Sequence, residues 1–421
     1  MRLNEEQKRI LAGEKGKILQ SAMVDLVKYG TAMGAEEFIP ISSAHTSFLP
    51  MAKTAMCFPP RGVQLTKEDV DRFSEEMTGL RVNVKTTINP GVIDIEKWRE
   101  IGADEGTYHA VMRAGEIARK CGILPTYSCT PYISENIPIM GESCAWAETS
   151  ACLYINSFLG ARSNRESFET SLYSALLGIT PNFGMHLDEN RKGTHLIDVQ
   201  CEIRSKSDWG ALGYFTGERV SLGIPVFNHL KRPTVEEAKQ LATCINVPGS
   251  TTLFHIPGVT PEAATIEEAF GGNIPRETYI FGEAAKKETY RHLNYEPEGK
   301  VDMVFLGCPH ATLYEIKEIC DLLEGKHVAG ETALWVMTSH ATRAAAYRAG
   351  YGQIIEDSGG KLFADGCLGM YYLYYPLKRP VLKRVATNAA KQAFTVRRSF
   401  GSKVFFGNEK RCIEIAVAGC A

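Results

Sequence analysis

The chain has 421 residues, 44% of them hydrophobic and 23% charged, so it can bury a large core and form two or three domains. A formal net charge of -2 and the lack of a long Lys/Arg run argue against a nucleic-acid-binding or anionic-membrane-binding protein. The charged N-terminal segment lacks the apolar core of a signal peptide, and the most apolar stretch, residues 144–161, is interrupted by polar side chains. We therefore expect a cytoplasmic enzyme without a membrane span.

The N-terminal half contains patterns of both helices and strands. Asn4 is expected to cap the first helix, and Gly13 to stop it. The other expected elements are, in chain order, a helix at 17–28, a strand at 38–45, a helix at 65–77, a strand at 81–90, a helix from 108 followed by a strand at 123–129, and a buried helix at 145–161.

The C-terminal half begins less regularly. Residues 208–248 are irregular in pattern and rich in charge, which favours an inserted domain, and Thr260 is expected to cap a helix after it. A cleaner alternation then predicts strands at 301–307, 333–337 and 361–366, with helices at 312–325 and 340–350 between them. Such an alternation is typical of a parallel sheet with right-handed crossovers. The predicted domains are 1–205, 206–295 and 296–421.

Three cysteines follow short apolar runs next to turn residues: Cys129 in TYSCTPY, Cys308 in VFLGCPH and Cys367 in LFADGC. Carboxyl ends of parallel strands share one edge of a sheet, so three strands could bring the three thiolates to one point. Three thiolates suit an iron–sulfur cluster with one open iron corner. Packing in the core is the ordinary role of any single buried cysteine, but the repeated pattern favours a shared ligand role.

The twelve cysteines form no CxxC pair, which argues against zinc ribbons and thioredoxin-like chemistry. Packing is the expected role of the cysteines within apolar patterns, Cys144, Cys152, Cys320 and Cys412. Motifs for dinucleotide, P-loop, nucleophile-elbow and zinc-helix sites are absent from the sequence.

Several polar segments could bind an anionic substrate. Arg162 and Arg165 in GARSNR could lie on one side of a helical turn, where they would bind a carboxylate or phosphate; a salt-bridged basic turn is the alternative. The segments 42–45 and 86–89 end two predicted strands with short polar side chains, which could bind substrate oxygens or only cap turns.

Taken together, these segments resemble the large subunit of the aconitase X family. The matching stretches, in family order, are GAEEFIPISSAH, TTINPGVIDIEKWREIG, YSCTPYISENIPIMGESCAWAETSA, INSFLGARSNRES, GMHLDENR, GVTPEA, GCPHATLYEI, ADGC and VATNAAKQAF. The resemblance implies an aconitase-like, multi-domain α/β fold with parallel sheets flanked by helices. It also implies an iron–sulfur cluster, [4Fe–4S] or of lower nuclearity, with Cys129, Cys308 and Cys367 as ligands.

By the same resemblance, Asn164 and Arg165 fall in the GARxNR signature, and Asn388 and Lys391 in ATNxAK. The candidate substrate-binding residues are Thr87, Asn89, Arg162, Asn164, Arg165, Asn388 and Lys391. The chain departs from the family pattern at TSFLPMAKTA (46–55) and at LGMYYLYYP (368–376), both of which could line the substrate pocket.

The resemblance further implies a hydro-lyase that removes water from a hydroxy acid. The substrate is expected to be cis-3-hydroxy-L-proline, with 5-phosphomevalonate as the alternative. The chain ends at Ala421 without the swivelling domain of fused members, so we expect a separate small subunit that supplies the catalytic base. Base candidates within this chain are Ser43, His45 and His310. A regulatory protein that binds a metal cluster without turnover is the alternative from another class.

Overall fold

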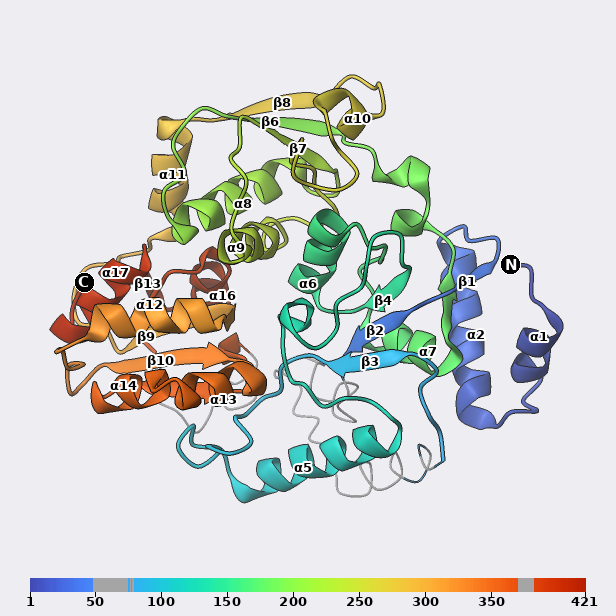
Figure 1. Cartoon of the computed structure of the whole chain (residues 1–421), viewed down its shortest axis with the longest axis horizontal. Helices are drawn as coiled ribbons and strands as arrows, with labels where there is room; N and C mark the ends of the chain where they lie inside the picture. Colours follow the sequence, from blue (N-terminus) through green and yellow to red (C-terminus); the bar gives the residue numbers. More distant parts are fainter. Residues whose placement is uncertain (48–74, 76, 78, 370–381) are drawn as a thin grey trace. The chain divides into compact units, whose positions relative to one another are not determined.

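The computed structural model describes residues 1–47, 75, 77, 79–369 and 382–421. The chain divides into two compact units, and each is described by itself (Figure 1). Unit 1 comprises residues 1–127 and 131–192, and unit 2 comprises residues 128–130 and 193–421. Within the described ranges, no helix is long and apolar enough to cross a membrane.

Unit 1 contains a three-stranded parallel sheet in the order β3-β2-β4 and an antiparallel pair of β1 with β5. Its strands are β1 (Phe38–Pro40), β2 (Ser43–Thr46), β3 (Lys85–Ile88), β4 (Cys144–Trp146) and β5 (Ile179–Pro181). Its helices are α1 (Glu5–Leu11), α2 (Lys17–Ala32), α5 (Glu105–Lys120), α6 (Thr149–Tyr154) and α7 (Phe168–Leu177), with a π-helix at Ile155–Leu159 and 3₁₀ turns at Pro131–Ile133, Gly184–His186 and Asp188–Arg191.

The first predicted helix is confirmed with its cap: Asn4 and Gln7 form a reciprocal capping box at the start of α1. The expected strand at 38–45 is instead two strands, because the chain changes partners at Ile41 and Ser42. The amide of Ile41 donates to the Gly178 carbonyl, and that of Ser42 donates to the Ser143 carbonyl. The helix predicted at 65–77 lies largely outside the described residues.

Two further predictions in unit 1 were wrong in part. Residues 123–129 form no strand: Pro125 cannot donate to a ladder, and Tyr127 has a left-handed φ of 44°, so only Leu124 bridges to β3. The buried helix expected at 145–161 is divided into β4, α6 and the π-helix, which ends at the left-handed Gly160. Its burial is confirmed, because the core contains nearly all of this stretch.

Unit 2 contains two all-parallel sheets, β7-β6-β8 and β11-β10-β9-β12-β13. The strands are β6 (His195–Val199), β7 (Pro225–Asn228), β8 (Glu277–Phe281), β9 (Met303–Ala311), β10 (Ala333–Thr338), β11 (Lys361–Ala364), β12 (Arg384–Thr387) and β13 (Lys403–Phe406). The helices are α8 (Lys206–Val220), α9 (Val235–Ile245), α10 (Ile266–Phe270), α11 (Glu283–Leu293), α12 (Leu313–Leu323), α13 (His340–Arg348), α14 (Tyr351–Asp357), α16 (Ala390–Phe400) and α17 (Glu409–Ala418). The predicted α/β class with parallel, helix-flanked sheets is confirmed.

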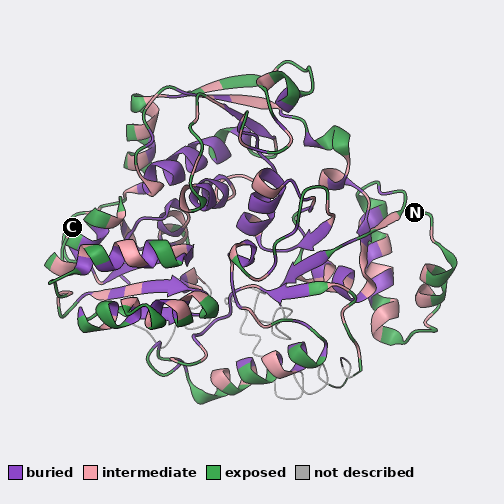
Figure 2. Cartoon of the chain, viewed as in Figure 1, coloured by how far each residue is buried: buried purple, intermediate pink, exposed green. Residues whose placement is uncertain are grey.

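The supposedly irregular region after residue 205 is regular. Helices α8 and α9 are buried over most of their length, as Figure 2 shows. Helix α8 is buried on nearly all sides, so it lacks the polar face by which an amphipathic helix is recognised. The helix expected to start at Thr260 begins after Thr265, whose side chain caps α10, while the Thr260 hydroxyl donates to the Ile256 carbonyl. The three-domain division with boundaries near 205 and 295 stays a prediction.

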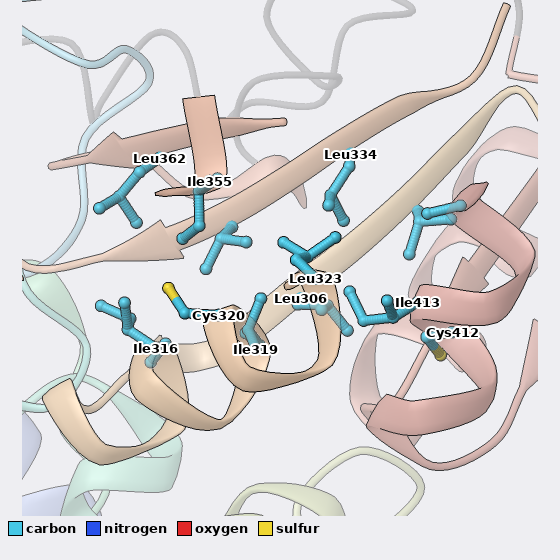
Figure 3. Close-up of a cluster of buried hydrophobic side chains, with 14 of the residues drawn as sticks. Leu306, Ile316, Ile319, Cys320, Leu323, Leu334, Ile355, Leu362, Cys412 and Ile413 are labelled. Carbon is cyan, nitrogen blue, oxygen red and sulfur yellow. The ribbon is translucent and has the colours of Figure 1, made fainter. Parts of the chain in front are cut away.

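The five-stranded sheet of unit 2 agrees with the predicted alternation of strands and helices. Leu306, Leu334 and Leu362 contribute one buried side chain each from β9, β10 and β11, and Ile316 and Ile319 of α12 pack against them (Figure 3). Thr312 caps α12 through a capping box with Glu315, so the helix begins directly after β9. Because all five strands are parallel, their carboxyl ends lie along the same edge of this sheet.

Candidate functional site

The central strand of this sheet bulges where Cys308 lies. Leu306 is opposite Val336 and Ala311 is opposite Thr338, so β9 carries extra residues between these pairs. Gly307 has φ +89°, and a Cβ there would lie 2.1 Å from the Met337 carbonyl oxygen. Only glycine fits this position, and its left-handed conformation turns the following residue out of the ladder. The prediction that the strand ends at Cys308 is therefore wrong, since β9 resumes and continues to Ala311.

Unit 2 contains all three of the predicted ligand cysteines, each of which is half-buried. Cys308 lies in the β9 bulge, Cys367 follows β11, and Cys129 comes from a loop rather than from the predicted strand. Burial raises the pKa of the Cys308 thiol; Lys391 opposes this shift, and the nearby Cys367 and Cys129 add to it. The three sulfurs are thus close enough to interact electrostatically, and a cation would favour their thiolate forms.

Among the described residues, no three His, Cys, Asp or Glu side chains are close enough to hold a single metal ion. A cluster requires a different spacing, because each cysteine ligates a separate iron of the cluster. The donor set of three half-buried thiols has the chemistry of such cluster ligands.

His310 contacts the segments of both other cysteines. Its main-chain amide donates to Cys129 Sγ at 3.3 Å, and its Nε2 lies 2.8 Å from the carbonyl oxygen of Gly366, which precedes Cys367. A carbonyl only accepts, so Nε2 carries the hydrogen. Burial lowers the pKa of His310 to about 4, and Lys239 adds to this, so the ring is neutral. As a base candidate, His310 already uses Nε2 for this contact.

Lys239 is a fully buried lysine on α9 that was not predicted from the sequence. Its Nζ donates to the carbonyls of Pro309 (3.2 Å) and His310 (2.7 Å) and forms an ion pair with Glu315 at 2.5 Å. Gln240 on the same helix donates to the Cys308 carbonyl at 3.2 Å. Helix α9 therefore binds three successive carbonyls of the bulge. The available sequence signal was a lysine inside an otherwise buried helical run, which requires a partner.

Two of the predicted substrate-binding residues lie beside this site. Strand β12 pairs directly with β9, Asn388 follows it, and Lys391 is in the first turn of α16. Lys391 is near enough to lower the pKa of Cys308. Asn388 is 4% exposed, and its Oδ1 has no hydrogen-bond partner among the described residues. Such a buried acceptor requires an explanation, and a bound ligand or water would provide one.

In unit 1, several of the predicted polar residues at the strand ends form a buried hydrogen-bond network. His45 Nδ1 lies 2.8 Å from Thr87 Oγ1, to which the Asn136 amide also donates at 3.1 Å. Ser43 receives a hydrogen bond from the Trp146 indole at 3.1 Å and donates to Cys144 Sγ at 3.4 Å. The two base candidates here, Ser43 and His45, are thus buried and engaged. Asn89 is half-buried, and its Oδ1 has no partner among the described residues.

The GARSNR segment is extended, not helical, so its predicted geometry was wrong. Arg162 bridges to Ser143 and Arg165 bridges to Trp146, both beside β4. Residues three apart in an extended chain do not share a face. Arg162 binds the Asp188 carboxylate and the carbonyl of His186. Arg165 is exposed.

Asn164, between the two arginines, is buried and bound within the chain. Its amide donates to the Phe183 carbonyl at 3.0 Å, and its Oδ1 accepts from the Met185 amide at 2.8 Å. These contacts hold the turn at Gly184, where a Cβ would lie 2.2 Å from Asn164 Oδ1. The departures from the family pattern fall mostly outside the described residues, at 48–55 and 370–376.

Comparison with known proteins agrees with this architecture. Models of the first, second and third aconitase X domains match residues 1–189, 193–291 and 301–418. The phosphomevalonate dehydratase large subunit of Methanocaldococcus jannaschii is 37% identical over 97% of this chain and 98% of its own length. The chain belongs to the aconitase X family. It is a dehydratase, a hydro-lyase, and not the non-catalytic regulatory protein that we considered as an alternative.

Other aconitase X relatives differ in substrate and length. The crystal structure of Thermococcus kodakaraensis aconitase X in its holo-form matches with a TM-score of 0.84 and 35% identity, covering 99% of this chain and 100% of that one. The cis-3-hydroxy-L-proline dehydratase of Pseudomonas aeruginosa is 32% identical over 99% of this chain but only 70% of its own length. The aconitase X relatives thus include both dehydratases, one of them considerably longer than this chain.

Proposed function

We propose that this aconitase X chain is the large subunit of an iron–sulfur dehydratase that removes water from a small hydroxy acid. The observation that carries the proposal is the placement of three cysteines in unit 2: Cys308 lies in the β9 bulge, and His310, two residues later, contacts Cys129 Sγ and the Gly366 carbonyl that precedes Cys367. Cys129, Cys308 and Cys367 would hold the cluster. When bound, the cluster would supply a Lewis-acidic iron for the departing hydroxyl group. A [4Fe–4S] cluster and one of lower nuclearity both suit three thiolates.

The chain's own residues would bind and orient the substrate. The exposed Arg165 guanidinium presents a planar fork suited to a carboxylate, and we assign that role to it. Asn388, with its buried and unpartnered Oδ1, and Lys391 would bind polar groups near the cluster. Thr87, Asn164 and Arg162 already have partners within the chain, so we assign them the support of the binding surface.

The catalytic base is proposed to come from a separate small subunit. All three base candidates in this chain have other contacts: Ser43 with Trp146, His45 with Thr87, and His310 with Gly366. Archaeal relatives that match end to end are named large subunits, whereas the Pseudomonas aeruginosa relative has further sequence of its own. We therefore assign the catalytic base to a partner chain, which the name large subunit implies for those relatives.

Two substrates follow from the relatives' names, and we put cis-3-hydroxy-L-proline first. Its only acidic group is one carboxylate, so it needs fewer free arginines than a phosphorylated acid. Two of the arginines in the GARSNR and HLDENR segments are already engaged: Arg162 by Asp188, and Arg191 by the carbonyls of Met185 and Asn156. 5-Phosphomevalonate is the second candidate. It is supported by identities of 37% and 36% to two phosphomevalonate dehydratase large subunits, against 32% to the hydroxyproline enzyme of Pseudomonas aeruginosa.

The test measures dehydration of both compounds by the chain alone and with a co-expressed small subunit. Without the base, we expect activity about 10²–10⁴-fold lower, because general-base catalysis contributes that much. Added partner should restore activity along a saturable curve. Full activity of the isolated chain would contradict the two-subunit proposal, and turnover of neither compound by the complex would contradict both substrate assignments.

A further inference from the structure

His310 is unusual in that its main chain and side chain contact different parts of the cysteine site. The amide binds Cys129 Sγ, the imidazole binds the Gly366 carbonyl, and the residue lies two positions after Cys308. Its carbonyl accepts from Lys239, which anchors it to α9. One residue therefore connects the segments of Cys129, Cys308 and Cys367, which are far apart in the sequence.

The imidazole contact is directional. Nε2–H is the donor toward Gly366, and the other ring nitrogen, Nδ1, is buried without a partner among the described residues. The residue is 3% exposed, so water does not compete freely for the Gly366 carbonyl. Gly366 follows Asp365, which has a left-handed φ of 62°, and the Gly366 amide donates back to the carbonyl of Ala364, the last residue of β11, at 2.6 Å. The His310 side chain thus links the turn after β11, which leads to Cys367, to the β9 bulge.

We propose that His310 is a positioning residue, whose Nε2–H holds the Cys367 turn against the β9 bulge and so sets the spacing of the three cysteines for the cluster. The consequence for cluster binding rests on the proposed function, but the hydrogen bond from His310 to Gly366 is a property of the chain alone. If this proposal is right, the position of Cys367 requires a hydrogen-bond donor where Nε2 lies but does not require an imidazole ring.

Two variants separate these requirements. In His310→Gln, the side-chain amide nitrogen reaches approximately where Nε2 lies, so the donor is kept. In His310→Asn, the side chain is one methylene shorter and its amide falls near the Nδ1 position, so the contact to Gly366 is lost. His255→Asn is the control for loss of a buried histidine in the same unit, since His255 lies beside β7 and is 1% exposed.

The first measurement is the alkylation rate of Cys367 in the metal-free full chain, read by mass spectrometry, with the exposed Cys420 as internal reference. His310→Asn should raise the Cys367 rate about 5–10-fold, the effect of one lost hydrogen bond on local opening. His310→Gln and His255→Asn should stay within about twofold of the wild type. The Cys420 rate should not change in any variant.

The second measurement is iron and sulfide content, with visible circular dichroism, after anaerobic reconstitution of the same proteins. We expect His310→Gln to retain the cluster and His310→Asn to lose most of it. If His310→Asn does not fold, His310→Phe, which fills similar space without a donor, replaces it in both measurements. The proposal is overturned if His310→Gln shows the same alkylation rate and cluster loss as His310→Asn. It is also overturned if His310→Asn matches the wild type. A wild type that binds no cluster contradicts the proposed function. The alkylation rates would still show whether the hydrogen bond from His310 to Gly366 positions Cys367.

Discussion

Polar side chains gather at the carboxyl ends of parallel strands in both units, but their state differs. At the β3-β2-β4 sheet of unit 1, Thr87 is bonded to both His45 and Asn136 within a buried network. In unit 2, the carboxyl ends of β9 and its neighbours carry Cys308 and Cys367, and Cys129 belongs to the same site. Asn388, which follows the neighbouring strand β12, has a buried Oδ1 without a partner among the described residues. Position at a strand end is therefore not enough to identify a site. A buried acceptor without a partner is not enough either, because Asn89 at the end of β3 has one too. The three cysteines are what distinguish the site at β9.

The largest expected effect tests the cluster edge itself. Replacing Cys129, Cys308 or Cys367 with Ala should abolish the visible absorption of anaerobically prepared protein and its dehydratase activity, because in the proposed site each thiolate would hold a separate iron. Cys152→Ala and Cys320→Ala are the controls, and both should retain the cluster. A full complement of iron and sulfide in any one of the first three variants would contradict a shared site.

The next effect concerns the ion pair under the bulge. Lys239→Met leaves Glu315 buried without its partner, so the free energy of unfolding should fall by about 3–5 kcal/mol, measured by urea titration. The double variant Lys239→Met/Glu315→Gln should recover much of this loss, because it removes the orphaned charge but keeps an acceptor for the Thr312 amide of the capping box. Equal destabilisation in the single and double variants would show that the contacts to the Pro309 and His310 carbonyls, rather than the charge pair, are decisive.

Unit 1 has its own buried carboxyl, Glu166, whose pKa burial raises to about 7 although Thr170 donates to it at 2.6 Å. The folded state therefore holds this proton at pH values where the unfolded chain, with a pKa near 4.5, has lost it. Stability should fall as pH rises from about 4.5 to 7, by about 3 kcal/mol at most. Glu166→Gln should flatten this pH dependence in urea titrations at pH 5 and 8, whereas Glu169→Gln should not. An unchanged slope in Glu166→Gln would contradict the assignment.

The smallest effect tests the exposed arginine of unit 1. Arg165→Lys keeps the charge but loses the planar fork, so kcat/KM should fall about 10–100-fold, or about 1.4–2.7 kcal/mol. Cluster content should not change, and Arg113→Lys on α5 is the matched control. Turnover near that of the wild type would assign the GARSNR segment a purely structural role.

The sequence by itself determined the α/β class and the C-terminal alternation of strands and helices, and it predicted the three cysteines that we propose as ligands. These features depend on local periodicity, capping residues such as Thr312 and short motifs, all of which can be seen in a linear sequence. The same information failed at residues 123–129, where Pro125 and the left-handed Tyr127 prevented the expected strand. It also failed for α8, because a buried helix has no amphipathic pattern to read.

Only the tertiary structure decided which polar groups are engaged and which are open. Ser43, His45 and His310 were equivalent as base candidates in the sequence, but each proved to have a partner in the fold. Lys239 lies 69 positions before Cys308 and was not recognised, although its helix binds the bulge that carries this cysteine. The physical reason is that hydrogen bonds and ion pairs between distant segments depend on three-dimensional proximity, which local sequence patterns do not encode.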